Sequence, residues 1–139
     1  MLQRQLFAAY MKLYRPFINE INTALAPYQL FNSQYRIMRM LYQQEQSLTF
    51  HEIAKYAFIE KPSASNLIHK LISLGYVSTT EGSDKRQKNV CLTEEGRRVF
   101  EETDEMINHI IQPMLEGVSE EEQRIVICVM EQIAANLSQ

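Results

Sequence analysis

The chain has 139 residues and a formal net charge of −3, with 45% hydrophobic and 22% charged residues. This length fits one domain with helical additions, and the composition excludes disordered, collagen-like and mucin-like proteins. Its two cysteines, Cys91 and Cys128, are too few for a disulfide framework. No run approaches the ~18 apolar residues that a membrane span needs. We therefore expect a folded cytoplasmic protein with no membrane partner.

The net acidity argues against a nucleic-acid partner, but the charge is unevenly distributed. Residues 1–93 contain 11 Lys and Arg against 6 Asp and Glu, whereas residues 94–139 contain 3 against 11. A basic part joined to an acidic part indicates that one side of the molecule could face a polyanion. The alternative is that the acidic stretches are ordinary solvated helix faces, and charge alone does not decide between them.

The chain is predicted to be mainly helical, since it contains only 4 Gly and 4 Pro. Apolar residues recur at helical spacing over residues 2–25. Pro16 within this run predicts a kink near Arg15 or a helix that begins after the proline. A second helix, capped by Asn32, is expected over residues 33–44.

Two further helices are predicted before a change of pattern. Thr49 and Glu52 match the capping box that opens a helix. Pro62 suits the first turn of the next helix, and Gly75 is the expected terminator. The spacing predicts that this helix buries Ala64, Leu67, Ile68, Leu71 and Leu74. Its outer face would carry Ser63, Ser65, Asn66, His69, Lys70 and Ser73.

The next segments alternate between strand-like and helical patterns. Residues 76–80 and 90–93 are rich in β-branched and aromatic side chains and predict a two-stranded hairpin with a basic loop over 81–89. Such a hairpin must pack against the helices to be stable. Thr93 is expected to cap a long helix, and a second capping box at 119–122 opens the last one.

This order of elements is that of a winged helix-turn-helix, and two motifs resemble one family. Residues 84–96, from Asp84 through Arg86, Leu92 and Thr93 to Gly96, match the wing signature D-x-R-x(5)-L-T-x-x-G of MarR-type regulators. Residues 70–77 are similar to the exit of that family's recognition helix. The resemblance implies a mainly α fold with a two-stranded β-wing. It also implies three parts: an N-terminal dimerisation helix (1–30), a winged helix-turn-helix DNA-binding domain (31–96) and C-terminal dimerisation helices (97–139).

The candidate DNA-binding residues lie on the recognition helix and the wing. A recognition helix places its N-terminal half in the major groove, and the candidates there are Pro62, Ser63, Ser65, Asn66, His69 and Lys70. By the wing motif, Arg86 would enter the minor groove and Asp84 would hold its guanidinium. Lys85 and Lys88 would contact phosphates. The alternative is that these are solvated helix positions and a weak loop ion pair.

The resemblance implies a ligand-responsive repressor that binds double-stranded DNA, at a pseudo-palindromic operator, as a homodimer. A small aromatic or anionic effector is expected in the family's pocket, with Tyr14, Arg15, Tyr35 and Arg39 as candidate contacts; packing and surface roles are the alternative for these residues. A second interpretation of the function is a helical protein–protein interaction module whose winged helix binds a protein partner.

Catalytic and metal-binding patterns are not found in the sequence. It contains no nucleophile–base pair, phosphate loop or carboxylate dyad, so we expect no enzyme and no cofactor. His51, His69 and His109 lack the neighbouring ligands that a metal site needs. Cys91 and Cys128 are interpreted as buried packing residues.

Overall fold

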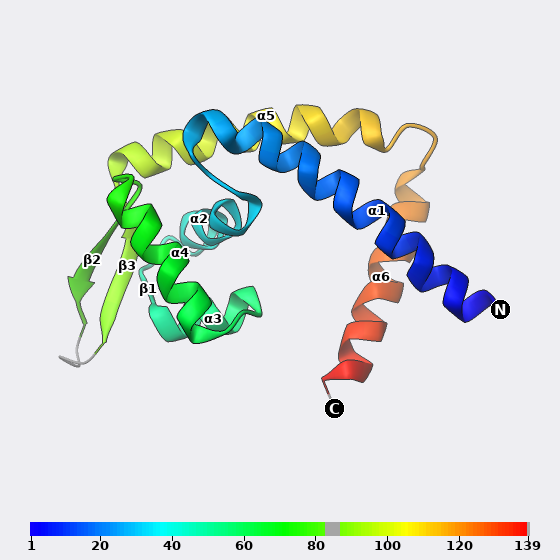
Figure 1. Cartoon of the computed structure of the whole chain (residues 1–139), viewed down its shortest axis with the longest axis horizontal. Coiled ribbons are helices and arrows are strands. Elements are labelled where there is room, and N and C mark those ends of the chain that lie inside the picture. Colours follow the sequence, from blue (N-terminus) through cyan, green and yellow to red (C-terminus); the bar gives the residue numbers. More distant parts are fainter. Residues whose placement is uncertain (83–86, 139) are drawn as a thin grey trace. The chain divides into compact units, whose positions relative to one another are not determined.

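The computed structural model describes residues 1–82 and 87–138 (Figure 1). In chain order the elements are α1 (Leu2–Leu25), the 3₁₀ turn η1 (Ala26–Tyr28), α2 (Asn32–Gln44), β1 (Leu48–Thr49), α3 (Phe50–Ala57), α4 (Lys61–Ser73), β2 (Val77–Glu81), β3 (Lys88–Leu92), α5 (Glu94–Met114) and α6 (Glu120–Leu137). They form two units, Met1–Ile107 and Asn108–Gln139. No helix in the described part of the chain is long and apolar enough to cross a membrane.

Helix α1 continues through Pro16, so the expectation of a helix beginning after this residue is wrong. A proline removes one backbone hydrogen bond, and the remaining bonds of this long helix are enough to carry it past that position. Only Ile21 and Leu25, near its C-terminal end, are buried, whereas every residue from Met1 to Pro16 is exposed. The first four turns therefore present apolar side chains to solvent.

The start of α2 differs from the prediction. Asn32 was expected to cap this helix but lies inside its first turn, and Phe31 occupies the N-cap position. The Phe31 amide donates to Gln34 Oε1 at 2.8 Å, and the Asn32 amide donates to Asn22 Oδ1 of α1 at 2.7 Å. These side chains satisfy amides that a helix start leaves unpaired, which also ties α2 to α1.

Helices α3 and α4 form the predicted helix-turn-helix. The capping box of α3 is confirmed, because the Thr49 amide donates to Glu52 Oε1 at 2.9 Å and the Glu52 amide donates to Thr49 Oγ1 at 3.1 Å. Helix α4 ends as expected at Gly75, whose φ of 81° is the left-handed conformation that favours glycine. Of the predicted inner stripe of α4, Ala64, Ile68 and Leu71 are buried, and Leu67 and Leu74 are half-buried.

The sheet has three antiparallel strands in the order β1-β3-β2, so the prediction of a two-stranded hairpin is incomplete. Strand β1 has only two residues and pairs Leu48 with Val90, which is too short a segment to stand out by side-chain alternation. Strands β2 and β3 extend to Glu81 and Lys88, which face each other. The expected loop over 81–89 is therefore shorter at both ends.

The start of α5 explains the spacing of the wing signature. Thr93 Oγ1 donates to the Gly75 carbonyl at 2.6 Å and accepts from the Gly96 amide at 2.9 Å. Gly96 packs directly on the backbone of Tyr76, where a Cβ would lie 1.8 Å from the Tyr76 carbonyl oxygen. The threonine and the glycine thus join α5 to the end of α4, and any larger residue at position 96 would force them apart.

The first unit has a continuous core, and the second has none of its own. Side chains from α2, α3, α4 and β3 are completely buried: Ile37, Met38, Ile53, Ile68, Leu71 and Val90. In the second unit the capping box of α6 is confirmed at Ser119 and Glu122, but no described residue is buried. Cys128 is exposed, so it is not a packing residue within this chain, contrary to the interpretation from the sequence; Cys91 is half-buried beside Ser78.

Candidate nucleic-acid interface

The outer face of α4 is polar and open to solvent. Because Ala64, Ile68 and Leu71 face the core, the rotation of the helix is fixed by packing. The predicted recognition residues then lie on the other side: Pro62, Ser63, Asn66, His69 and Lys70 are exposed, and Ser65 is half-buried. The structure thus brings all six candidates on this helix to its outward side.

The N-terminal end of α4 is suited to an anionic partner. Pro62 lies in its first turn, which contains no acidic residue, and the N-cap residue Glu60 is exposed and makes no side-chain cap hydrogen bond. The amide groups and the dipole at such an end favour negative charge. Lys61, exposed at the first helical position, adds a positive charge there.

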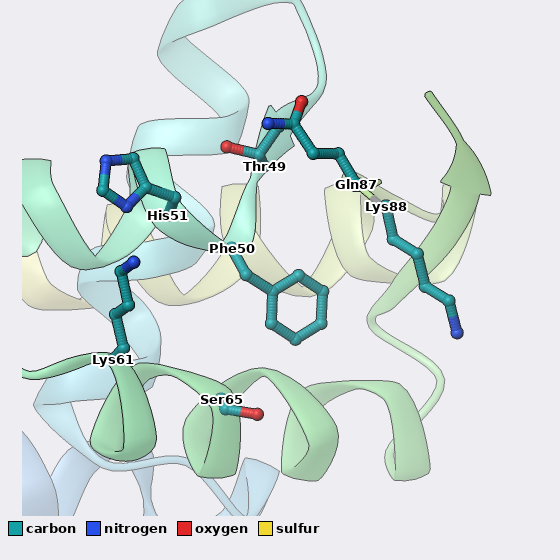
Figure 2. A pocket seen from close by; sticks show the side chains of 7 residues that line it. All are labelled: Thr49, Phe50, His51, Lys61, Ser65, Gln87 and Lys88. Atoms are coloured by element: carbon teal, nitrogen blue, oxygen red, sulfur yellow. The ribbon is translucent and has the colours of Figure 1, made fainter. Parts of the chain in front are cut away.

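A hollow of about 430 Å³ lies beside α4 (Figure 2). Its lining comes from the start of α3, from α4 and from the strand side of the wing: Thr49, Phe50, His51, Lys61, Ser65, Gln87 and Lys88. The Phe50 ring lies 5.7 Å from the His69 ring, centroid to centroid, so it connects the hollow with the recognition face. Sequence reasoning missed all of these residues except Ser65 and Lys88. A basic residue at the start of the recognition helix, Lys61, was the available signal.

The wing is described only in part. Lys88, a predicted phosphate contact, is exposed at the start of β3. Asp84, Lys85 and Arg86 lie outside the described residues, so their assigned roles stay predictions. The sheet and the Thr93 contacts nevertheless determine where both strands of the hairpin leave the body of the unit.

The four candidate effector contacts fall into two pairs. Tyr35 is buried, its hydroxyl donates to Asp104 of α5, and Arg39 Nη1 lies 3.7 Å from the same carboxylate. Burial, and then the hydrogen bond and charge of Asp104, raise the pKa of Tyr35 to about 12. Tyr14 and Arg15 are exposed and line a shallow depression along α1. No hydrogen bond or ion pair between described residues joins the two pairs, so the effector role of all four stays a prediction.

Two helices joined by a tight turn, an outward polar second helix and an adjoining antiparallel hairpin define a winged helix-turn-helix protein. Residues 28–87 match the model of the MarR family. Over 137 residues the chain is 29% identical to an uncharacterized HTH-type transcriptional regulator of Staphylococcus aureus, covering 96% of this chain and 92% of that protein.

Solved structures agree with this classification. The S. aureus MarR in complex with salicylate and kanamycin matches with a TM-score of 0.86 and 27% identity, over 99% of this chain and 93% of that one. The S. aureus MepR-DNA complex has the same fold, with a TM-score of 0.84 and 23% identity over 94% and 96% of the two chains. The chain is therefore similar to MarR-family regulators over nearly its whole length, and it matches the family model over residues 28–87.

Proposed function

We propose that this regulator is a repressor that binds a pseudo-palindromic operator as a homodimer, in the cytoplasm, and acts by binding rather than by catalysis. The observation that carries the proposal is the recognition face of α4, which is polar, exposed and flanked by Lys61 and Lys88. A DNA-bound relative of the same fold, the MepR-DNA complex, supports double-stranded DNA as the partner.

The homodimer is supported by apolar surface at both ends of the chain. Large hydrophobic side chains are exposed along α1 and α6: Leu2, Leu6, Phe7, Tyr10, Met11, Leu13, Tyr14, Ile125, Val126, Ile127, Val129, Met130 and Leu137. Exposed apolar side chains in such numbers on one helix are typical of protein interfaces. Segments 1–30 and 97–139 would therefore serve dimerisation and segment 31–96 DNA binding. Two-fold symmetry then places the half-sites about one helical turn apart, roughly 34 Å.

The proposed roles of individual side chains follow from their chemistry. Asn66 can pair with adenine in the major groove through two hydrogen bonds, and Lys70 can reach guanine or phosphate. Arg86, held by Asp84, would enter a narrow minor groove. Lys85 and Lys88 would add affinity that does not depend on sequence.

A small aromatic anion is the proposed effector. The salicylate-bound relative supports this class of ligand. Tyr35 and Arg39 meet Asp104, so they join α2 to α5. An anion that competes with Asp104 for Arg39 would weaken this link and shift the population of DNA-binding conformations.

The test is selection of genomic DNA fragments by the purified chain, followed by mobility-shift assays on the fragments recovered. Enrichment of one inverted repeat, with affinity that falls steeply as salt rises, would support the proposal. Asn66→Ala should relax base preference at one position of each half-site, at a cost of about 1–3 kcal/mol. Absence of DNA binding at low salt would favour the second interpretation, an interaction module for a protein partner.

A further inference from the structure

We propose that Glu60, the residue just before α4, specifies a cytosine in each half-site of the operator by accepting a hydrogen bond from the cytosine 4-amino group. This inference rests on the proposed function, because it concerns the same DNA. It adds an acidic residue to the base contacts proposed for Asn66 and Lys70, and it gives a role to a carboxylate on the side that would face a polyanion.

The backbone holds Glu60 in a fixed position at the N-cap of α4. Its carbonyl accepts from the Ala64 amide at 2.9 Å, so the residue is part of the first hydrogen-bonded turn. The turn before it is joined to α3, since the Ile59 amide donates to the Ala54 carbonyl at 3.1 Å. A recognition helix places its N-terminal half in the major groove, so Glu60 lies at the end of α4 that would enter the groove.

No contact within the described part of the chain accounts for the carboxylate of Glu60. An N-cap residue normally uses its side chain to accept from an amide of the first turn, and Glu60 makes no such bond. The residue is exposed and takes part in none of the ion pairs between described residues. Its carboxylate is thus available to a partner, at a place where phosphates alone would repel it.

Positive charge nearby lowers the cost of placing this carboxylate against DNA. The amide groups and the dipole at the N-terminal end of a helix favour an anion, and Lys61 follows directly and is exposed. The alternative explanation is that Glu60 only stabilises this end of α4. That role would affect stability and not base preference, so the two explanations predict different responses of DNA binding to substitution.

Cytosine is the base that suits a group with acceptors only. An ionised carboxylate has no donor, and two bases present donors in the major groove, cytosine through N4 and adenine through N6. The N6 group of adenine lies beside the N7 acceptor, which would repel a carboxylate, whereas N4 of cytosine has no acceptor beside it on the same base. The spacing of Glu60 and Asn66 corresponds to about 9 Å along the helix. The cytosine should therefore lie about two or three base pairs from the adenine that Asn66 would contact.

The experiment compares Glu60→Ala and Glu60→Gln with wild type in mobility-shift assays, on a selected operator whose half-site positions carry each of the four bases in turn. Wild type should bind about tenfold more weakly when the cytosine is replaced in both half-sites. Glu60→Ala should lose this preference and keep those at other positions. Glu60→Gln should prefer adenine there, because an amide pairs with adenine through two hydrogen bonds. Glu101→Gln, the same charge change at an exposed site on α5, should behave as wild type.

A second arm removes the amino group from the DNA instead. The cytosine is replaced by 2-pyrimidinone, a base analogue that lacks the 4-amino group. Wild type should lose about tenfold in affinity beyond any loss shown by Glu60→Ala, which no longer uses that group. On a scrambled duplex both Glu60 variants should bind more tightly than wild type, because a negative charge near the phosphates has been removed. Thermal unfolding checks that each variant is folded.

Three outcomes would overturn the inference. In the first, Glu60→Ala keeps the wild-type base preference at every position. In the second, both variants weaken binding to the operator and to the scrambled duplex by the same factor, which would mean that Glu60 only stabilises the end of α4. In the third, the preference lost on substitution is for a base other than cytosine. Failure of wild type itself to bind any duplex would instead refute the proposed function.

Discussion

The winged module contains apolar patterns similar to those in the first four turns of α1 and in α6, but the side chains of the two regions differ in burial. In the module, from α2 to β3, Ile37, Ile68 and Val90 are 0% exposed. In α6, Ile125 is 56% exposed and Met130 is 48% exposed. A periodic apolar stripe therefore shows that a helix has a face to bury, and it does not show whether the partner belongs to the same chain.

The difference has a simple geometric cause. Helices α2, α3 and α4 and a three-stranded sheet enclose one core, so each apolar stripe meets another within the module. The N-terminal turns of α1 and the whole of α6 bury no residue. Burial of apolar surface stabilises a protein by about 25 cal/mol per Å². Packing these exposed faces against a second copy of the chain would therefore add substantial stability.

The largest expected effect is in the core of the module. Ile68→Ala should lower the free energy of unfolding by about 2–5 kcal/mol, because it removes a fully buried side chain and leaves a cavity. Urea unfolding followed by circular dichroism measures this loss. The matched variant is Ile127→Ala in α6, which is 53% exposed within the chain. The loss of unfolding free energy caused by Ile127→Ala should depend on protein concentration. If this loss equals that of Ile68→Ala and does not depend on concentration, the difference in burial between the module and α6 is contradicted.

A charge on the apolar face of α6 should separate the two regions further. If α6 forms the proposed dimer interface, Val129→Glu should weaken dimerisation by at least about tenfold, or 1.4 kcal/mol, because a carboxylate would be buried there. Sedimentation velocity over a concentration series measures the change, and Glu131→Gln on the same helix is the control. A wild-type chain that is monomeric at micromolar concentration would remove the basis of this prediction.

The two capping boxes offer a smaller and closely matched test. Thr49→Ala and Ser119→Ala each remove one side-chain acceptor at 3.1 Å from a backbone amide, at a cost of about 1 kcal/mol. For Thr49→Ala this should lower the stability of the whole module. For Ser119→Ala we expect mainly faster hydrogen exchange in the first turn of α6. Equal losses in global unfolding would show that α6 unfolds together with the module.

The smallest effect at neutral pH concerns Tyr35. Its folded pKa of about 12 lies above the ordinary value of 10.0, so the unfolded chain loses this proton first. The contribution to stability is complete below pH 10 and is lost as pH rises from 10 to 12. Tyr35→Phe should remove this contribution to the decrease in unfolding free energy between pH 10 and 12, as measured by urea unfolding at several pH values. The control Tyr14→Phe, at an exposed site, should keep the wild-type profile.

Local chemistry made much of the fold predictable. Capping boxes at Thr49 and Ser119, Pro62 in the first turn of α4 and Gly75 at its end all act within a few residues. The polar face of α4 followed from its periodicity. In contrast, β1 and the cap of α2 depend on residues distant in sequence, Val90 and Asn22, and were missed.

The sequence by itself therefore determined the order of the helices, the wing signature and the residues that face outward on α4, because these depend on short-range spacing. Only the tertiary structure decided that Phe50, Lys61 and Lys88 line one hollow, and that Tyr35 and Arg39 meet at Asp104. Such groupings join residues from different elements. They arise from how the elements pack, which periodicity along a single element does not specify.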